Sequence, residues 1–78
     1  MVQTTLDNLP EGGKGIIRDI LKKDKTTERL EVLGFSKGSA VIKLFSSPFG
    51  DPSAYLIGST VVAIRREDAL AVIVEIVC

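Results

Sequence analysis

The sequence contains no histidine and no tryptophan, and its only cysteine is Cys78. Without histidine the chain cannot build the two-histidine, one-carboxylate iron site, and one thiol cannot hold an iron–sulfur cluster. The missing histidine also removes the side chain that most often acts as a general base near neutral pH. We therefore expect no enzymatic activity, no catalytic residues, no cofactor and no dedicated metal site.

A lone cysteine also excludes an intrachain disulfide, which favours a reducing, cytoplasmic location. Residues 1–5 show neither the basic start nor the apolar stretch of a signal peptide. The longest nearly uncharged run, 52–64, is interrupted by Gly58, Ser59 and Thr60. It is also shorter than the roughly 20 apolar residues of a membrane-spanning helix. We expect a soluble protein that does not insert into a membrane.

The chain has no excess of either charge, with ten Lys and Arg against ten Asp and Glu. Zero net charge disfavours nucleic acid as a partner, because non-specific affinity for the phosphate backbone comes from an excess of cations. The charges are nevertheless uneven: residues 14–43 contain eight Lys or Arg and four Asp or Glu, and the rest contains two and six. Such a dipole can orient a protein partner.

At 78 residues the chain has room for one small domain, spanning 1–78. The sequence predicts a capped turn at 5–10 that places Leu6 and Leu9 on the core, and a polar turn at 65–69. A helix with a threonine N-cap is expected at 26–34, ending at Gly34. Period-two and β-branched runs predict strands at 15–21, 39–45, 53–57, 60–64 and 70–76. This pattern favours an all-β fold with short inserted helices, a small and strongly bent antiparallel barrel.

The same periodicity predicts which side chains face the core. Leu70, Val72, Val74 and Ile76 share one face of the last strand, with Glu75 on the other. The side chains on which the fold is expected to depend are Ile16, Ile20, Leu30, Leu33, Val72 and Val74.

Two features suggest chemistry but have simpler interpretations. Gly12 to Gly15 includes a Gly-Lys pair, yet Asn8 and Gly15 stand where a phosphate-binding P-loop needs glycine and Ser or Thr. We expect a glycine turn before the first strand there. Asp51 lies between Gly50 and Pro52, which is typical of an Asx turn bonded to its own loop.

Arginines offer a further alternative. Arg29, Arg65 and Arg66 could reach a nucleotide phosphate in a partner, as arginine fingers do. Pairing on the surface with Glu31 or Glu67 is the simpler expectation.

The order of motifs along the chain resembles the FeoA family of small cytoplasmic proteins of bacterial ferrous iron transport. Its most specific piece is the Pro-x-Gly-Asp-Pro loop, followed by the Leu-Gly-x-x-x-Gly helix exit. Two departures are Lys37, where the family commonly has proline, and Ile64, where leucine is usual. The matching residues are Leu6, Gly15, Arg29, Leu30, Leu33, Gly34, Phe35, Gly38, Pro48 to Pro52, Gly58, Ile64, Arg65, Asp68 and Ala69.

The resemblance implies an SH3-like barrel and a role beside the large FeoB-type membrane transporter, whose cytosolic part carries a GTP-binding domain. We expect a non-catalytic protein-interaction module that binds this cytosolic part and so supports ferrous iron uptake. The alternative is a detached metal-regulator domain, similar to the C-terminal docking barrel of iron-dependent repressors.

The aromatic residues suggest where a partner would bind. Phe49 lies in a loop between Pro48 and Gly50, where no strand can bury it, and small barrels use such loop aromatics to hold peptide segments. Phe35 follows the helix-ending Gly34, a position that usually makes a hydrophobic contact within the motif. The predicted partner surface consists of Phe35, Pro48, Phe49, Gly50, Asp51 and Pro52.

Overall fold

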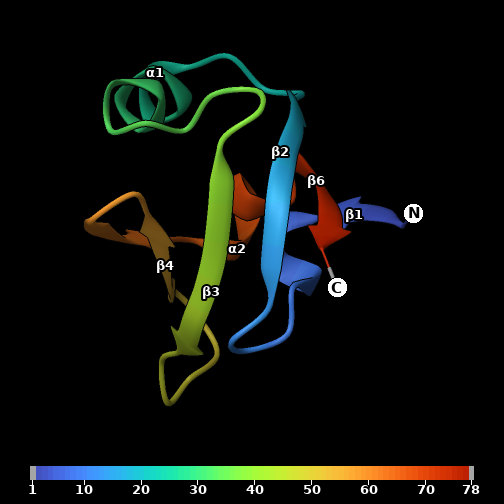
Figure 1. Ribbon diagram of the computed structural model, residues 1–78. Coiled ribbons are helices and arrows are strands. Elements are labelled where there is room, and N and C mark those ends of the chain that lie inside the picture. Colours follow the sequence, from blue (N-terminus) through green and yellow to red (C-terminus); the bar gives the residue numbers. More distant parts are fainter. Residues whose placement is uncertain (1, 78) are drawn as a thin grey trace.

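The computed structural model describes residues 2–77 as one bent antiparallel sheet with three short helices (Figure 1). The strands are β1 (Gln3–Thr5), β2 (Lys14–Ile20), β3 (Ala40–Ser46), β4 (Ser53–Ile57), β5 (Thr60–Ile64) and β6 (Val72–Val77). The helices are the 3₁₀ turn η1 (Leu6–Asn8), α1 (Lys25–Val32) and α2 (Arg66–Ala69). Cys78, on which the disulfide argument rests, lies outside the described residues.

The strand order is β1-β6-β2-β3-β4-β5, so the first and last strands of the chain pair with each other. In Figure 1, β2 and β3 form the front of the molecule, and the two ends of the sheet fold back behind them with α2 between. The all-β class with short inserted helices is therefore confirmed. The sequence missed β1, because its residues Gln3–Thr5 are polar and only three long.

The core fills the inside of this bend. Leu6 and Leu9 are almost fully buried at the two ends of η1, as the sequence predicted. Val72 and Val74 of β6 are also fully buried. The buried cluster consists of Leu6, Leu9, Ile17, Leu30, Phe35, Val41, Tyr55, Ile57, Ile64, Ala69, Val72 and Val74.

In β2 the predicted inward face was wrong. Ile17 is fully buried, whereas Ile16 is half-buried. Gly15 determines which residues of β2 point inward. Its Cα faces Val74, and a Cβ there would lie 3.2 Å from the Cβ of Val74. Because strand side chains alternate, Ile17 takes the same inward direction. Ile20 packs against the core after a register shift between Ile17 and Asp19.

Helix α1 begins at Lys25, one residue before its predicted start. Asp24, not a threonine, is the N-cap, and it forms a capping box with Thr27. This box places Thr27 and Leu30 on the buried face, while Leu33 is 39% exposed. The prediction that Leu33 is core was therefore wrong.

Phe35 occupies the core position that Leu33 was expected to fill. Gly34 has φ +109°, and the Phe35 N–H donates to the Leu30 carbonyl at 2.9 Å while the Gly34 N–H donates to that of Glu31. This is the Schellman motif, which turns the chain and brings the residue after glycine onto the helix's apolar face. Phe35 is accordingly fully buried.

The predicted polar turn at 65–69 is the short helix α2. It buries Ala69 completely, and Asp68 nearly so. Leu70 follows this helix and is 49% exposed, so its predicted place in the last strand was wrong. The reason is that the chain must turn through residues 70 and 71 before β6 can begin at Val72.

Candidate functional site

The outer side of the sheet carries an apolar surface over β3, β4 and β5. Pairing across the strands places Ile42, Leu56 and Val61 in one row. Phe45, Ala54 and Ala63 form the next row. Residues paired in this way share a face of the sheet. We call these six residues, Ile42, Phe45, Ala54, Leu56, Val61 and Ala63, the outer apolar face.

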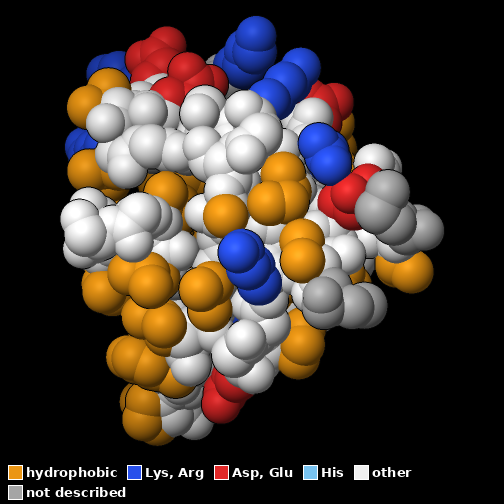
Figure 2. Space-filling model, viewed as in Figure 1, with side chains coloured by type: hydrophobic (Ala, Val, Ile, Leu, Met, Phe, Trp, Pro, Cys, Tyr) orange, Lys and Arg blue, Asp and Glu red, His pale blue; other side chains and the backbone are white. Residues whose placement is uncertain are grey.

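The outer apolar face is exposed at its rim and is bordered by Lys14 of β2, which pairs with Ile42. Phe45 is 55% exposed and Val61 60%. In Figure 2, hydrophobic side chains gather over the lower left of the molecule, where β3, β4 and the loop between them lie, and most charged side chains lie at the top. A cationic side chain lies among the hydrophobic ones near the centre, and an acidic side chain lies at the lower edge. Large apolar side chains exposed near one another, as Phe45 and Val61 are, are typical of a protein-interaction site.

The loop 47–52 extends beyond the end of β3 and holds Phe49 in solvent. The Gly50 N–H donates to the Ser47 carbonyl at 2.8 Å, and the Ser47 N–H donates to the Pro52 carbonyl at 3.1 Å. These two bonds close the loop on itself, and Gly50 takes φ +81°, a value suited to glycine. Phe49 is left 95% exposed. The loop therefore presents one aromatic side chain on a closed backbone.

Asp51 ties this loop to α2. Its Oδ1 accepts a hydrogen bond from the backbone N–H of Arg66 at 2.9 Å, so it caps the start of α2 from fifteen residues away. The predicted Asx turn within the loop was therefore wrong. A cavity of about 520 Å³ lies between loop and helix, lined by Asp51, Pro52, Arg65, Arg66, Glu67 and Leu70.

The structure does not bring Phe35 to the loop. The side chain of Phe35 is fully buried and unavailable to a partner in this conformation. Phe35 precedes β3 and the loop follows it, so the two lie at opposite ends of that strand (Figure 1). Among the predicted site residues, Pro48, Phe49, Gly50, Asp51 and Pro52 form one exposed surface loop.

Two polar side chains from the inner face anchor η1 to the sheet. Lys43 is 8% exposed, and its Nζ donates to the Asp7 carbonyl at 3.1 Å. The hydroxyl of Tyr55 donates to the Leu6 carbonyl at 3.4 Å. Burial raises the pKa of Tyr55 to about 12. Tyr55 therefore stays neutral, and both residues serve the fold and not the surface.

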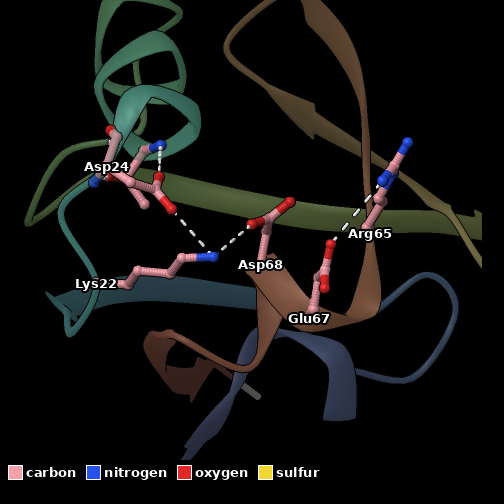
Figure 3. Close-up of polar contacts among 6 residues, drawn as sticks. Lys22, Asp24, Arg65, Glu67 and Asp68 are labelled. Carbon is pink, nitrogen blue, oxygen red and sulfur yellow. Dashed lines mark hydrogen bonds and ion pairs between the residues drawn. The ribbon is translucent and has the colours of Figure 1, made fainter.

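Lys22 joins the start of α1 to α2 (Figure 3). Its Nζ lies 3.0 Å from Asp24 Oδ2 and 3.3 Å from Asp68 Oδ1. The hydrogen bond to Asp24, followed by that to Asp68, raises the pKa of Lys22. Arg65 and Glu67 form a looser pair nearby, at 3.9 Å. The Arg65–Glu67 pair confirms the pairing expected from the sequence. The contact between Lys22 and Asp68 was missed, because these two residues lie 46 positions apart in the chain.

The described part of the chain carries neither a metal-ligand cluster nor a membrane-spanning helix. No group of three or more His, Cys, Asp or Glu side chains within residues 2–77 could hold a metal ion. Of the helices formed by these residues, none has the length and hydrophobicity that crossing a membrane requires.

A family model for the FeoA domain matches residues 4–76, nearly the whole chain. The chain belongs to the FeoA family. This membership links it to ferrous iron transport and confirms the resemblance inferred from its motifs. A comparison with curated proteins found no match.

Solved structures of FeoA proteins share the fold. A crystal structure of an iron uptake regulatory protein (FeoA) is 26% identical, with a TM-score of 0.85, and the alignment covers 99% of this chain and 100% of that one. FeoA of Stenotrophomonas maltophilia is 30% identical, with a TM-score of 0.82 and coverage of 92% and 89%. That structure is a zinc complex described as an SH3 domain protein, with a suggested role as a ferrous iron transport activating factor. The chain thus has the SH3-like fold.

A manganese-dependent transcriptional repressor has the same fold in part of its chain. It is 22% identical with a TM-score of 0.81, and the match covers 96% of this chain and 42% of the repressor. At this identity the likeness shows the fold alone.

Proposed function

We propose that this FeoA-family protein is a non-catalytic, single-domain interaction module of the cytoplasm. It supports ferrous iron uptake by binding the cytosolic, GTPase-containing part of a FeoB-type membrane transporter. It acts through contact and requires neither a cofactor nor a metal of its own. Family membership supplies the link to ferrous iron transport. The observation that carries the interaction role is the exposure of Phe49, at 95%.

The proposed partner surface consists of the loop residues Pro48, Phe49, Gly50, Asp51 and Pro52 together with the outer apolar face. Exposure of Phe49 in water is unfavourable, whereas burial in a partner's pocket removes its ring from solvent. The closed loop and its tie to α2 through Asp51 reduce the entropy that binding would cost. Phe45 and Val61 supply further exposed apolar area on the outer side of the sheet.

The test is the affinity of Phe49→Ala for the purified cytosolic part of the transporter, measured by isothermal titration calorimetry. An exposed aromatic anchor is worth ~1–2 kcal/mol of binding, so we expect about tenfold weaker association. The melting temperature should be unchanged, because the ring has no buried contacts to lose.

Val32→Ala is the matched control, because Val32 is 86% exposed on α1 and lies outside the proposed surface. It should bind as the wild type does. Equal affinity of Phe49→Ala and wild type would contradict the proposal, and so would equal weakening by both variants.

A further inference from the structure

The free edge of β5 presents unpaired backbone groups. β5 is the last strand in the sheet order, so only its β4 side is paired. The β4–β5 turn is a two-residue loop in which Gly58 has φ +59° and Ser59 does not have positive φ. This is the type II′ pattern, in which Ile57 and Thr60 exchange hydrogen bonds. Alternation then directs the N–H and C=O groups of Val61 and Ala63 away from β4.

This edge lacks the features by which sheets normally avoid pairing. Charged residues, proline and bulges usually protect exposed edge strands. β5 reads Thr-Val-Val-Ala-Ile, and its register with β4 has no shift. The opposite edge, β1, is only three residues long. β5 is therefore the edge better suited to accept a further strand.

Space for an added strand exists between β5 and α1. A cavity of about 500 Å³ lies at the Thr60 end, bounded on the helix side by Leu33 and Gly34. A second cavity, of about 400 Å³, lies at the Ala63 end, bounded on the helix side by Arg29 and Leu30. Cavities of this size accommodate peptide side chains.

The two ends differ in charge. The Thr60 cavity is lined by uncharged residues, including Leu33 and Ile57. The Ala63 cavity is lined by Lys22, Arg29 and Arg65 together with Glu67 and Asp68. Lys22 is held by Asp24 and Asp68, and Arg65 only by Glu67 at 3.9 Å on an exposed surface (Figure 3). Arg29 forms no ion pair within the described part of the chain. A carboxylate would therefore complement the Ala63 end.

We propose that an extended segment of the transporter's cytosolic part adds to β5 as an antiparallel strand. Because this strand runs opposite to β5, its N-terminal end lies beside Arg29 and Arg65 and carries an acidic residue. Its following residues are apolar and approach Leu33. Main-chain hydrogen bonds to Val61 and Ala63 hold the strand, and the charge fixes its direction. The identity of the partner rests on the function proposed above.

The first experiment uses the whole protein and two synthetic peptides. One is acetyl-Glu-Glu-Val-Thr-Val-Thr-Val-amide, and the other has the same residues with both glutamates at the C-terminal end. Titration followed by ¹⁵N NMR should shift the Val61 and Ala63 amide signals and slow their hydrogen exchange. The first peptide should bind at least fivefold more tightly than the second. Equal affinity, or shifts confined to other strands, would overturn the proposal.

Two pairs of variants test the backbone and the charge. Val61→Pro removes an N–H that β4 does not use, so the fold should persist while peptide binding is lost. Val61→Thr keeps this N–H and should bind the peptide as the wild type does, because the added strand contacts the backbone of Val61 and not its side chain. Arg29→Glu should weaken binding of the first peptide at least fivefold, whereas Lys25→Glu, on the same helix but outside the cavities, should not. Normal peptide binding by both Val61→Pro and Arg29→Glu would overturn the proposal.

The same variants separate this inference from the proposed function. If Val61→Pro and Arg29→Glu bind the transporter's cytosolic part as the wild type does, while Phe49→Ala binds weakly, strand addition is wrong and the interaction role stands. If the wild type does not bind that part at all, the proposed function fails. In that case the NMR titration could still show that β5 binds extended peptides, but the transporter would not be the partner.

Discussion

The inner and outer faces of the sheet differ in burial more than in hydrophobicity. On β3 the inner face carries Val41 and a lysine, Lys43, whereas the outer face carries Ile42 and Phe45. Val41 is fully buried and Lys43 8% exposed, yet Phe45 is 55% exposed. A buried cation and an exposed phenylalanine on one strand show that apolar character alone does not identify the core. The inner face stabilises the fold, and the outer face is available for binding.

Phe35, which is buried in the core, and Phe45, which is exposed on β3, give the sharpest contrast between the inside and the outside of the sheet. Phe35→Ala should cost about 3–5 kcal/mol, since Phe35 is fully buried, and a domain this small has little more in total. Phe45→Ala should cost less than about 1 kcal/mol. Urea unfolding followed by circular dichroism measures both. Similar costs for the two would contradict the assignment of faces.

High pH should destabilise the folded protein, because Tyr55 is buried on the inner face of the sheet. Its pKa is about 12 in the folded protein and 10.0 when unperturbed, so the unfolded state loses the proton first. Stability is therefore intact below about pH 10 and falls by about 2–3 kcal/mol as pH rises to 12. Lys22, whose pKa is also raised, acts in the same direction.

The variant Tyr55→Phe isolates the tyrosine, because it has no hydroxyl to ionise. Its stability should fall less steeply than that of the wild type between pH 10 and 12. Parallel curves would mean that the Tyr55 hydroxyl ionises equally in both states.

Asp51 joins the loop to α2, and its removal should have a moderate effect. Asp51→Ala deletes the acceptor for the Arg66 N–H and should cost about 1 kcal/mol, as lost helix caps typically do. Asp51→Asn retains an acceptor oxygen and should therefore lose less stability than Asp51→Ala. Thermal unfolding of the three proteins checks this order. Unchanged stability of Asp51→Ala would show that the cap is not formed in solution.

The smallest expected effect concerns Leu33. Its side chain is 39% exposed, so Leu33→Ala should cost less than about 1 kcal/mol, whereas Leu30→Ala should cost about 2–4 kcal/mol. The melting temperatures of the two variants test whether α1 buries the face set by its capping box. Equal destabilisation would show that the Leu33 side of the helix also faces the core.

Local signals in the sequence predicted much of the fold. Gly58 and Ser59 gave the β4–β5 hairpin with its observed bounds, because a two-residue turn fixes the register. Where two interpretations were locally equivalent, the prediction failed. Ile16 and Ile17 are both apolar and β-branched, and only the close approach of Gly15 to Val74 decides between them. Phe35, and not Leu33, is buried, because the Schellman turn after the helix redirects the chain, which helical periodicity does not predict.

The candidate site was predictable only in its loop. Phe49 between Pro48 and Gly50 indicated exposure, and the structure places it in solvent. The outer apolar face was not predictable, because alternation in 39–45 and 60–64 does not say which set of residues faces inward. The Asp51 cap and the Lys22 cluster depend on pairs of residues distant in sequence, for which one sequence carries no signal.

The central claim is that the loop 47–52 and the outer side of β3, β4 and β5 form the partner surface. NMR footprinting tests it most directly: ¹⁵N-labelled protein is titrated with the unlabelled cytosolic part of the transporter, and line broadening is mapped along the chain. We expect broadening at Phe49, Phe45, Leu56 and Val61, with the amides of β1 and β6 unaffected. Broadening centred on β1 and β6, with the loop signals unchanged, would contradict the account.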